Sequence, residues 1–558
     1  MDISTACYLI LLPVLIFVWN EIQPVQVKQK ILHLYFILAI SLVIIVEILS
    51  LFLFPEWGST LNYRAFRYLL YPNEAAASVE WKLIISVATI SVVMILFWNY
   101  LFRKTLFLHQ NNFEKKWTGV FAVIIIPFLM IGMRGGLGQI SISESSAYFS
   151  ENNFLNQAAL NKTWYFIRNV LNNVQKKKPF YYFPEFIQPQ LFSKLYTKGE
   201  SKKWLNTNKP NIVLVILEGW NADIIGSLGG IKGLTPCFDS LAETGLLFTN
   251  MYGSGTRTDQ GVVSILSGFP AMPDLSIIQE VEKSVKLPSL IKDLKNVGYF
   301  TTFIYGGEPE FCNFQTYFVA QGTEKMIDKY DYPKSQRAIT WGVPDHLLLE
   351  KVSSELQTVK EPFFAITLTL SSHQPFDSPF KSTPETFDNA GKYKASTTYM
   401  DAAISKFVKK CSKEKWYNNT LFIFVADHGN TLPLKRDYND HERFHIPVLF
   451  HGNVLDSTMR GEKISTFANH HDLPATLLSQ LGMSYQSYRF SKDISADSVS
   501  SFAYWSTDNT MGWLTENQKI GINLHNAEVF SWIKQPVKEE QQNGIGYVQE
   551  ILKEYEKY

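Results

Sequence analysis

The sequence predicts two parts: an N-terminal bundle of transmembrane α-helices followed by an α/β domain. Residues 1–138 contain 17 charged residues, or 12%, whereas residues 139–558 contain 86, or 20%. Soluble domains average about 25%. From residue 211 onward, short apolar runs alternate with helix-like stretches, as in a sheet covered by helices. We expect a transmembrane domain at 1–138, a linker at 139–208, an α/β domain at 209–530 and a C-terminal tail at 531–558.

Composition excludes two broad classes of protein. The 52 Lys and Arg residues balance 51 Asp and Glu residues, whereas a general nucleic-acid binder has a basic excess. Four cysteines in 558 residues exclude a scaffold built on disulfides.

Four apolar runs predict about four membrane spans, at residues 5–19, 31–54, 83–102 and 118–133. A spanning helix needs about 20 apolar residues, so the second and third runs are long enough and the others are marginal. We expect the first run to be retained, because it lacks the basic leader and the small-residue cleavage site of a signal peptide.

Basic residues in the short loops predict the orientation. Lys28 and Lys30 follow the first run, and Arg103, Lys104, Lys115 and Lys116 follow the third. These loops are expected in the cytoplasm, which places the α/β domain outside the cell membrane; a further upstream span would also fit. Glu47 inside the second run is either a functional charge or, as we favour, a side chain that faces the bundle.

The linker contains a basic and aromatic segment. Lys176–Lys178 lies beside Phe180–Phe183. This pattern is typical of a segment on a membrane surface, and a solvated linker explains it equally well.

Five apolar runs predict buried strands. They are uninterrupted, as in strands that are covered on both faces, and lie at residues 211–217, 300–305, 363–370, 421–426 and 448–450. Helical segments such as 286–297 and 396–410 separate them. Together they predict a doubly wound α/β sheet.

Ligands bind at the carboxyl ends of the strands in such sheets. Glu218 follows the first run, His373 comes shortly after the third, and Asp427 and His428 follow the fourth. Carboxylates beside an imidazole are typical metal ligands. Asp427 before Gly429 also fits a plain turn, but Glu218 from a second strand favours a metal site.

A glycine-rich segment at residues 253–261 contains Thr258. Its glycines allow the backbone to approach a ligand closely. The apolar residues that follow predict a helix, and a hydroxyl at a helix N-terminus suits a bound phosphate. Taken alone, the segment is better explained as a plain loop.

Taken together, these segments resemble the alkaline phosphatase/sulfatase superfamily, and within it the lipoteichoic acid synthase-like membrane phosphotransferases. The resemblance covers the whole chain and implies that the α/β domain is sulfatase-like and extracytoplasmic. The matching segments are NIVLVILEGW with Glu218, GTRTDQG with Thr258, TLSSHQPF with His373, VADHGN with Asp427 and His428, RFHIPVLF with His445 and HHDLPATLLSQLG with Asp472.

The resemblance implies a reaction. Glu218, Thr258, Asp427 and His428 would bind one divalent metal, Mn²⁺ or Mg²⁺, which activates the threonine oxygen. Thr258 would attack the phosphorus of a membrane phospholipid with a glycerophosphate- or phosphoethanolamine-like headgroup. The resulting phospho-threonine would pass that group to a glycan or lipid acceptor.

Three further side chains have alternative interpretations. Arg257 steadies the phosphate or is a surface arginine. His373 binds substrate or moves a proton, or it only packs after its strand. His445 faces the metal or braces the strand that begins at Pro447.

One region departs from the family pattern. Members that polymerise glycerophosphate carry a histidine just after the strand that ends here at Tyr305, and tryptophan and arginine further on. This chain has Gly306 and Gly307, then Cys312-Asn313-Phe314. We expect a different headgroup pocket, with Glu308 and Asn313 as candidate lining residues.

Three other functions compete with the phosphotransferase interpretation. A sulfuric ester hydrolase needs Cys or Ser in a C/S-x-P-x-R setting, which neither Cys237 nor Cys312 has. A phosphatase or phosphodiesterase with water as acceptor remains the alternative, because its site would be nearly the same. A non-catalytic scaffold is disfavoured by the intact set of metal-binding residues.

Overall fold

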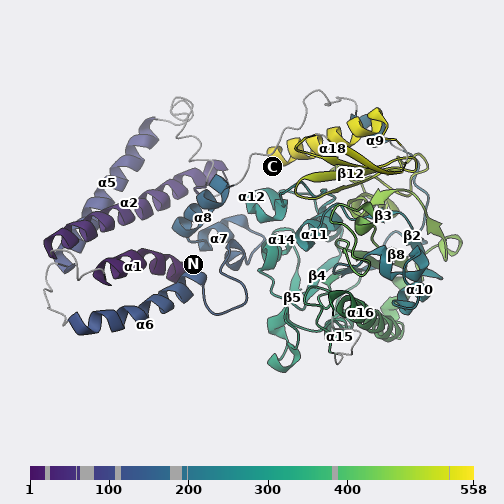
Figure 1. The fold of residues 1–558 in the computed structure, drawn as a ribbon, viewed down its shortest axis with the longest axis horizontal. Coiled ribbons are helices and arrows are strands. Elements are labelled where there is room, and N and C mark those ends of the chain that lie inside the picture. Colours follow the sequence, from purple (N-terminus) through teal and green to yellow (C-terminus); the bar gives the residue numbers. More distant parts are fainter. Residues whose placement is uncertain are drawn as a thin grey trace. The chain divides into compact units, whose positions relative to one another are not determined.

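The computed structural model describes residues 1–18, 25–57, 60–62, 81–106, 115–175, 191–197, 199–379, 388–526, 528–533 and 535–558. It divides into two compact units, Met1–Lys178 and Pro179–Tyr558 (Figure 1). The basic and aromatic segment at 176–183 lies outside the described residues, so its expected membrane contact stays a prediction.

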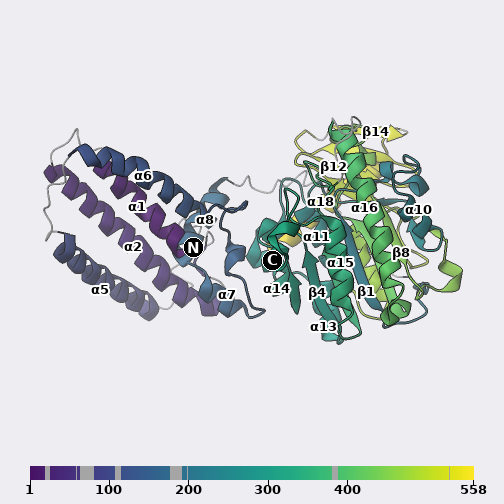
Figure 2. The ribbon, with the colours of Figure 1, turned by 90° about the horizontal axis from the view of Figure 1, so that it is seen from below.

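The first unit is built on four long helices at the positions of the four apolar runs: α1 (Asp2–Val18), α2 (Val25–Trp57), α5 (Trp81–Leu106) and α6 (Lys115–Arg134). Helix α1 packs against α6, and α2 packs against α5 (Figure 2). Large apolar side chains remain exposed on these helices, such as Leu38 and Leu96, each 61% exposed. Such a surface suits lipid better than water.

Only one stretch within the described residues is long and apolar enough to cross a membrane, judged by length and composition. It is Lys30–Pro55 in α2, with a mean hydropathy of 2.9. Shorter apolar stretches lie in the other three long helices, at Asp2–Leu15, Ile85–Leu101 and Ile124–Arg134.

Glu47 of α2 has a partner within the first unit. Its Oε2 lies 4.0 Å from Nζ of Lys162, at the start of α8 (Lys162–Gln175). This contact agrees with the interpretation that the carboxylate faces the bundle.

The region expected as a linker is shared between the units. In the first unit it forms α7 (Asn153–Ala159) and α8, which bury Leu160, Trp164 and Tyr165. In the second unit it contributes α9 (Leu191–Leu195) and Trp204, which is 2% exposed. Aromatic residues in both segments supply packing that a solvated linker lacks.

The second unit contains an eight-stranded sheet in the order β5-β4-β6-β1-β7-β8-β2-β9. The central strands are parallel, and β8 runs antiparallel to both neighbours. The five predicted runs form β1, β4, β6, β7 and β8. The bounds are β1 (Asn211–Leu217), β2 (Leu246–Phe248), β4 (Phe300–Tyr305), β5 (Lys325–Ile327), β6 (Phe363–Leu368), β7 (Thr420–Ala426), β8 (Val448–His451) and β9 (Lys463–Ile464).

Helices cover both faces of this sheet, as the buried strands require. Figure 1 shows α15 and α16 on one side and α11 on the other. Besides α9, the α-helices of this unit that the structure describes before the C-terminal region are α10 (Pro236–Ala242), α11 (Thr258–Ser267), α12 (Val281–Ser284), α13 (Leu290–Asn296), α14 (Phe314–Ala320), α15 (Asp345–Leu356), α16 (Asn389–Cys411) and α17 (Leu473–Gln480).

The C-terminal region adds a second sheet and a long helix. Strands β11 (Ala503–Ser506), β12 (Thr510–Leu514), β13 (Lys519–Asn523) and β14 (Val529–Ile533) form an antiparallel sheet. Helix α18 (Lys538–Lys557) packs on β12. We expected residues 531–558 to form a tail, and this prediction is wrong. The segment instead completes β14 and forms α18. The reason is an apolar helix face that includes Ile545, Val548 and Ile551, all buried.

Candidate active site

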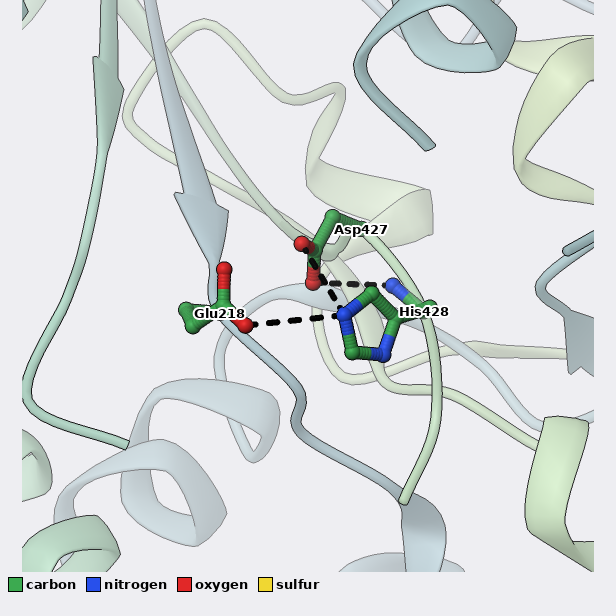
Figure 3. A group of neighbouring side chains, drawn as sticks. All are labelled: Glu218, Asp427 and His428. Atoms are coloured by element: carbon green, nitrogen blue, oxygen red, sulfur yellow. Dashed lines mark hydrogen bonds and ion pairs between the residues drawn. The ribbon is translucent and has the colours of Figure 1, made fainter. Parts of the chain in front are cut away.

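Two adjacent strands deliver three polar side chains to one point. Strands β1 and β7 are parallel and in register through Leu217 and Ala426, so the next residues, Glu218 and Asp427, emerge side by side. Each of Glu218, Asp427 and His428 offers a ligand atom within 4.8 Å of the others (Figure 3). The strand-end pattern thus predicted a real cluster.

The cluster concentrates negative charge in a buried place. Burial and the charge of Glu218 raise the pKa of Asp427 to about 7. Burial lowers the pKa of His428, but the two carboxylates outweigh it and raise that pKa to about 9. Burial also opposes ionisation of Glu218, whose pKa is nevertheless lowered by the hydrogen bond and charge of His428. Such a group is stabilised by a cation.

Asp427 carries an unused ligand atom. The carboxylate is fully buried, and its Oδ1 accepts hydrogen bonds from the backbone N–H groups of Gly219 and His428, both at 2.8 Å. Its Oδ2 accepts no hydrogen bond from any residue that the structure describes. It lies 3.5 Å from His428 Nε2, as an ion pair without a hydrogen bond. A buried carboxylate oxygen that accepts no hydrogen bond is costly, so the donor set fits a divalent cation with oxygen and nitrogen ligands.

Thr258 contacts this cluster from helix α11. It is the first residue of α11 and is 7% exposed. Its hydroxyl donates a hydrogen bond to Glu218 Oε2 at 3.0 Å and lies 3.5 Å from His428 Nε2. A Cβ at Gly261 would lie 2.1 Å from the carbonyl oxygen of Asp427, so only glycine allows α11 to approach this closely.

The cluster opens into a cavity of about 690 Å³. Five of the six predicted site residues line it: Glu218, Arg257, Thr258, His373 and His428. Asp427 is not part of the lining and lies beneath it. Phe311 and Cys312 supply apolar wall.

Arg257 and His373 occupy less enclosed positions. Arg257 is 52% exposed, with Nε 3.6 Å from Asp259 Oδ1. His373 is partly exposed, and its Nδ1 lies 2.8 Å from the carbonyl oxygen of Gln374. A carbonyl only accepts, so Nδ1 carries the hydrogen and Nε2 of the neutral ring is the accepting nitrogen. The ring also meets Trp341 edge-on at 4.4 Å.

Two hydroxyls that sequence reasoning missed hold the backbone of Glu218. Thr369 Oγ1 accepts a hydrogen bond from the N–H of Glu218 at 2.9 Å, and Ser372 Oγ donates to its carbonyl at 2.6 Å. Both belong to the segment that carries His373. Their place just after β6 was the available signal.

The remaining candidates have structural contacts. His445 Nε2 donates to the carbonyl of Thr249 at 2.8 Å and stacks on Tyr252, which supports the bracing interpretation. Glu308 Oε1 pairs with Lys329 Nζ at 2.6 Å. Neither Glu308 nor Asn313 is among the residues that line the cavity.

This geometry agrees with the comparison to protein families. Residues 210–483 match the family described as Sulfatase. They form a sulfatase-family domain of the alkaline phosphatase superfamily. The match includes every predicted site residue.

Two curated relatives of the sulfatase-family domain come from Bacillus subtilis. Lipoteichoic acid synthase-like YvgJ of Bacillus subtilis is 23% identical over 242 residues, which cover 42% of this chain and 39% of YvgJ. Lipoteichoic acid synthase 2 of the same organism is 23% identical over 305 residues, which cover 50% of this chain and 46% of the relative. The matched region thus spans less than half of either relative.

Two solved structures share the fold of the domain. A protein in the alkaline phosphatase superfamily from Vibrio parahaemolyticus superposes with a TM-score of 0.56 at 25% identity, covering 68% of this chain and 93% of its own. The lipoteichoic acid synthase LtaP from Listeria monocytogenes superposes with a TM-score of 0.54 at 18% identity, covering 67% and 98%.

Proposed function

We propose that this protein is a membrane-anchored, metal-dependent phosphotransferase that acts outside the cell membrane. It transfers a glycerophosphate- or phosphoethanolamine-like headgroup from a membrane phospholipid to a glycan or lipid acceptor. The observation that carries the proposal is the placement of the Thr258 hydroxyl, 3.0 Å from Glu218 within the cluster of Asp427 and His428. The names of the relatives and the apolar helices of the first unit support the lipid donor.

The cluster would hold one divalent cation, Mn²⁺ or Mg²⁺, through Glu218, Asp427, His428 and the hydroxyl of Thr258. When bound, the cation makes the threonine oxygen more acidic and offsets charge on the phosphoryl group. His428 Nδ1 lies 2.9 Å from the carbonyl of Gly429 and so carries the hydrogen, which leaves Nε2 as the ligand nitrogen.

Thr258 is the proposed nucleophile. Oγ1 loses its proton and forms a bond to phosphorus while the bond from phosphorus to the diacylglycerol oxygen breaks, and that oxygen takes up one proton, so the step is balanced. In the second step an acceptor hydroxyl loses its proton, attacks phosphorus and releases Oγ1. His373, which lines the cavity, is proposed to accept that proton at Nε2 and to return it to the released Oγ1. Arg257, which lines the same cavity, is proposed to steady the phosphoryl oxygens.

Lipid consumption tests the proposal. The full-length protein is incubated with Mn²⁺ and mixed vesicles of phosphatidylglycerol and phosphatidylethanolamine, and the lipids and the protein are analysed by mass spectrometry. We expect diacylglycerol release and a phosphorylated headgroup adduct on Thr258, both lost in EDTA. Free headgroup phosphate in place of an acceptor product would favour the hydrolase, and no lipid turnover with bound metal would overturn the proposal.

A further inference from the structure

The turn after β6 carries His373 into the cavity, although the sheet no longer supports it. Strand β6 ends at Leu368, and its last bond to β1 is the N–H of Thr369 donating to the carbonyl of Ile216 at 3.0 Å. Leu370 and Ser371 follow, and both are almost fully buried. Their N–H groups therefore need a partner other than a neighbouring strand.

Asp345 is that partner. Its Oδ1 accepts the N–H of Leu370 at 2.8 Å, and its Oδ2 accepts the N–H of Ser371 at 3.0 Å. The carboxylate is 0% exposed. It is the first residue of α15, where the helix dipole favours a negative charge.

The opposite side of the turn is tied to the candidate metal site. Thr369 and Ser372 hold the backbone of Glu218 through their hydroxyls. The N–H of His373 donates back to the carbonyl of Leu370 at 2.9 Å. The turn is thus clamped between the loop after β1 and the start of α15, with His373 at its end.

We infer that Asp345 is a positioning residue, which fixes the turn at residues 370–372 and thereby presents His373 to the cavity. The role of His373 in turnover rests on the proposed function, whereas the hold on the turn does not. Asp345 is not among the residues that line the cavity, and its two carboxylate oxygens accept hydrogen bonds from backbone N–H groups of the turn.

Asp401 provides a matched control. It is also buried, at 2% exposed, and its two oxygens accept the N–H groups of Cys237 and Phe238, each at 2.8 Å. Burial raises the pKa of each of the two carboxyls to about 6. Asp401 holds the start of α10 rather than the turn that carries His373.

Hydrogen exchange of the full-length protein tests the hold on the turn without any substrate. In Asp345→Asn one buried N–H loses its acceptor, so the amides of residues 370–373 should exchange at least about fivefold faster. Asp401→Asn should accelerate residues 237–238 and leave the turn unchanged. Unchanged protection of the turn in Asp345→Asn would overturn the inference, whether or not the protein turns over lipid.

A double-mutant cycle tests the consequence for His373. Diacylglycerol release from mixed phosphatidylglycerol and phosphatidylethanolamine micelles with Mn²⁺ is measured for Asp345→Asn, His373→Ala and the double variant. Asp345→Asn should lower kcat/KM at least tenfold alone and less than twofold when His373 is already alanine. If the losses in kcat/KM from Asp345→Asn and His373→Ala multiply in the double variant, Asp345 does not act through His373. Equal kcat/KM values for Asp345→Asn and Asp401→Asn would also contradict the positioning role.

Asp345→Glu is the second variant, should the asparagine variant fail to fold. It keeps both acceptor oxygens and adds one methylene, so it shifts the turn without leaving a buried N–H unpaired. The same dependence on His373 is expected, with a smaller loss. Independent effects of Asp345→Glu and His373→Ala would overturn the inference. If the wild type releases no diacylglycerol, the proposed function is wrong. Hydrogen exchange at residues 370–373 then decides by itself whether Asp345 fixes the turn.

Discussion

Thr256 and Thr258 belong to the same glycine-rich segment, yet they have different surroundings. Both line the cavity, but only Thr258 has its hydroxyl 3.0 Å from Glu218. The backbone N–H of Thr256 instead donates to the side chain of Gln260 at 3.1 Å. The two residues therefore form a natural pair for separating the nucleophile from a neighbouring hydroxyl.

We predict that Thr258→Ala keeps its metal and loses turnover by several orders of magnitude. The loss should exceed the roughly 10²–10⁴ typical of lost acid–base help, because a covalent step disappears. Thr256→Ala should retain substantial activity. Diacylglycerol release checks both variants; a dead Thr256→Ala beside an active Thr258→Ala would reassign the nucleophile, and equal modest losses would point to water as the attacking group.

A second prediction at this scale concerns the metal. Asp427→Asn can keep the two backbone bonds at Oδ1 but replaces Oδ2, which accepts no hydrogen bond, with an amide nitrogen. It should remove most of the bound Mn²⁺ while the fold survives, and Asp401→Asn should bind the metal fully. Elemental analysis after chelation and reloading with Mn²⁺ checks this. Stoichiometric Mn²⁺ in Asp427→Asn would contradict the assignment of the metal site.

Among the short elements, the 3₁₀ helix η12 (His441–Phe444) lies between β7 and β8 in the chain and contacts the second sheet through Glu442. Glu442 lies 2.9 Å from His441 Nε2, 3.6 Å from His445 Nδ1 and 3.4 Å from Lys519 Nζ of β13. The neighbouring His441 and His445 favour the charged carboxylate and hold the pKa of Glu442 well below its ordinary value of 4.5.

We predict that Glu442→Gln lowers the free energy of unfolding by about 1–3 kcal/mol at neutral pH, the range for bonds to charged groups. Because the folded pKa is depressed, this stabilisation is complete above about 4.5 and is lost as the pH falls toward the folded value. The difference between wild type and variant should therefore shrink in acid. Thermal unfolding across pH measures it, with Glu516→Gln in an exposed turn as control; a difference that is constant with pH would contradict the assignment.

Helix α18 supplies the next prediction. Ile551 is fully buried on its apolar face, whereas the Lys553 side chain is 61% exposed. Ile551→Ala should destabilise the second unit by about 2–5 kcal/mol, the cost of a cavity in a packed core. Lys553→Ala should stay within about 0.5 kcal/mol. Denaturant unfolding compares them, and similar values would mean that α18 is not an integral part of the unit.

Across the whole molecule, the sequence predicts the strands and side-chain positions that depend on local residue patterns. The run NIVLVIL coincides with β1 at Asn211–Leu217 because a strand buried on both faces needs no polar alternation. Glu218, Asp427 and His428 were predictable because parallel strands end at one edge. The role of Asp345 was not predicted, since its two acceptor oxygens bind N–H groups 25 and 26 residues away. Strands of two or three residues, such as β9, depend on tertiary pairing rather than on sequence pattern.

The N-terminal boundary of the second unit lies earlier in the structure than the sequence predicts. In the structure the second compact unit begins at Pro179, whereas the strand pattern in the sequence predicts a start at 209. Trp204 is 2% exposed and packs edge-on against Phe248 and Phe450, with ring centroids at 5.7 and 6.5 Å. The Tyr196 hydroxyl donates to the carbonyl of Phe490 at 2.9 Å. Both residues precede 209.

We therefore expect a fragment of residues 179–558 to fold without the first unit, because it contains its own core. A fragment of residues 209–558 should be less stable by at least about 3 kcal/mol, since losing a buried tryptophan alone costs about 3–5 kcal/mol. Trp204→Ala within the longer fragment should reproduce much of that loss. Urea unfolding of the three proteins measures the differences. Equal stability of both fragments would show that residues 179–208 add nothing to the core and would favour the start at 209.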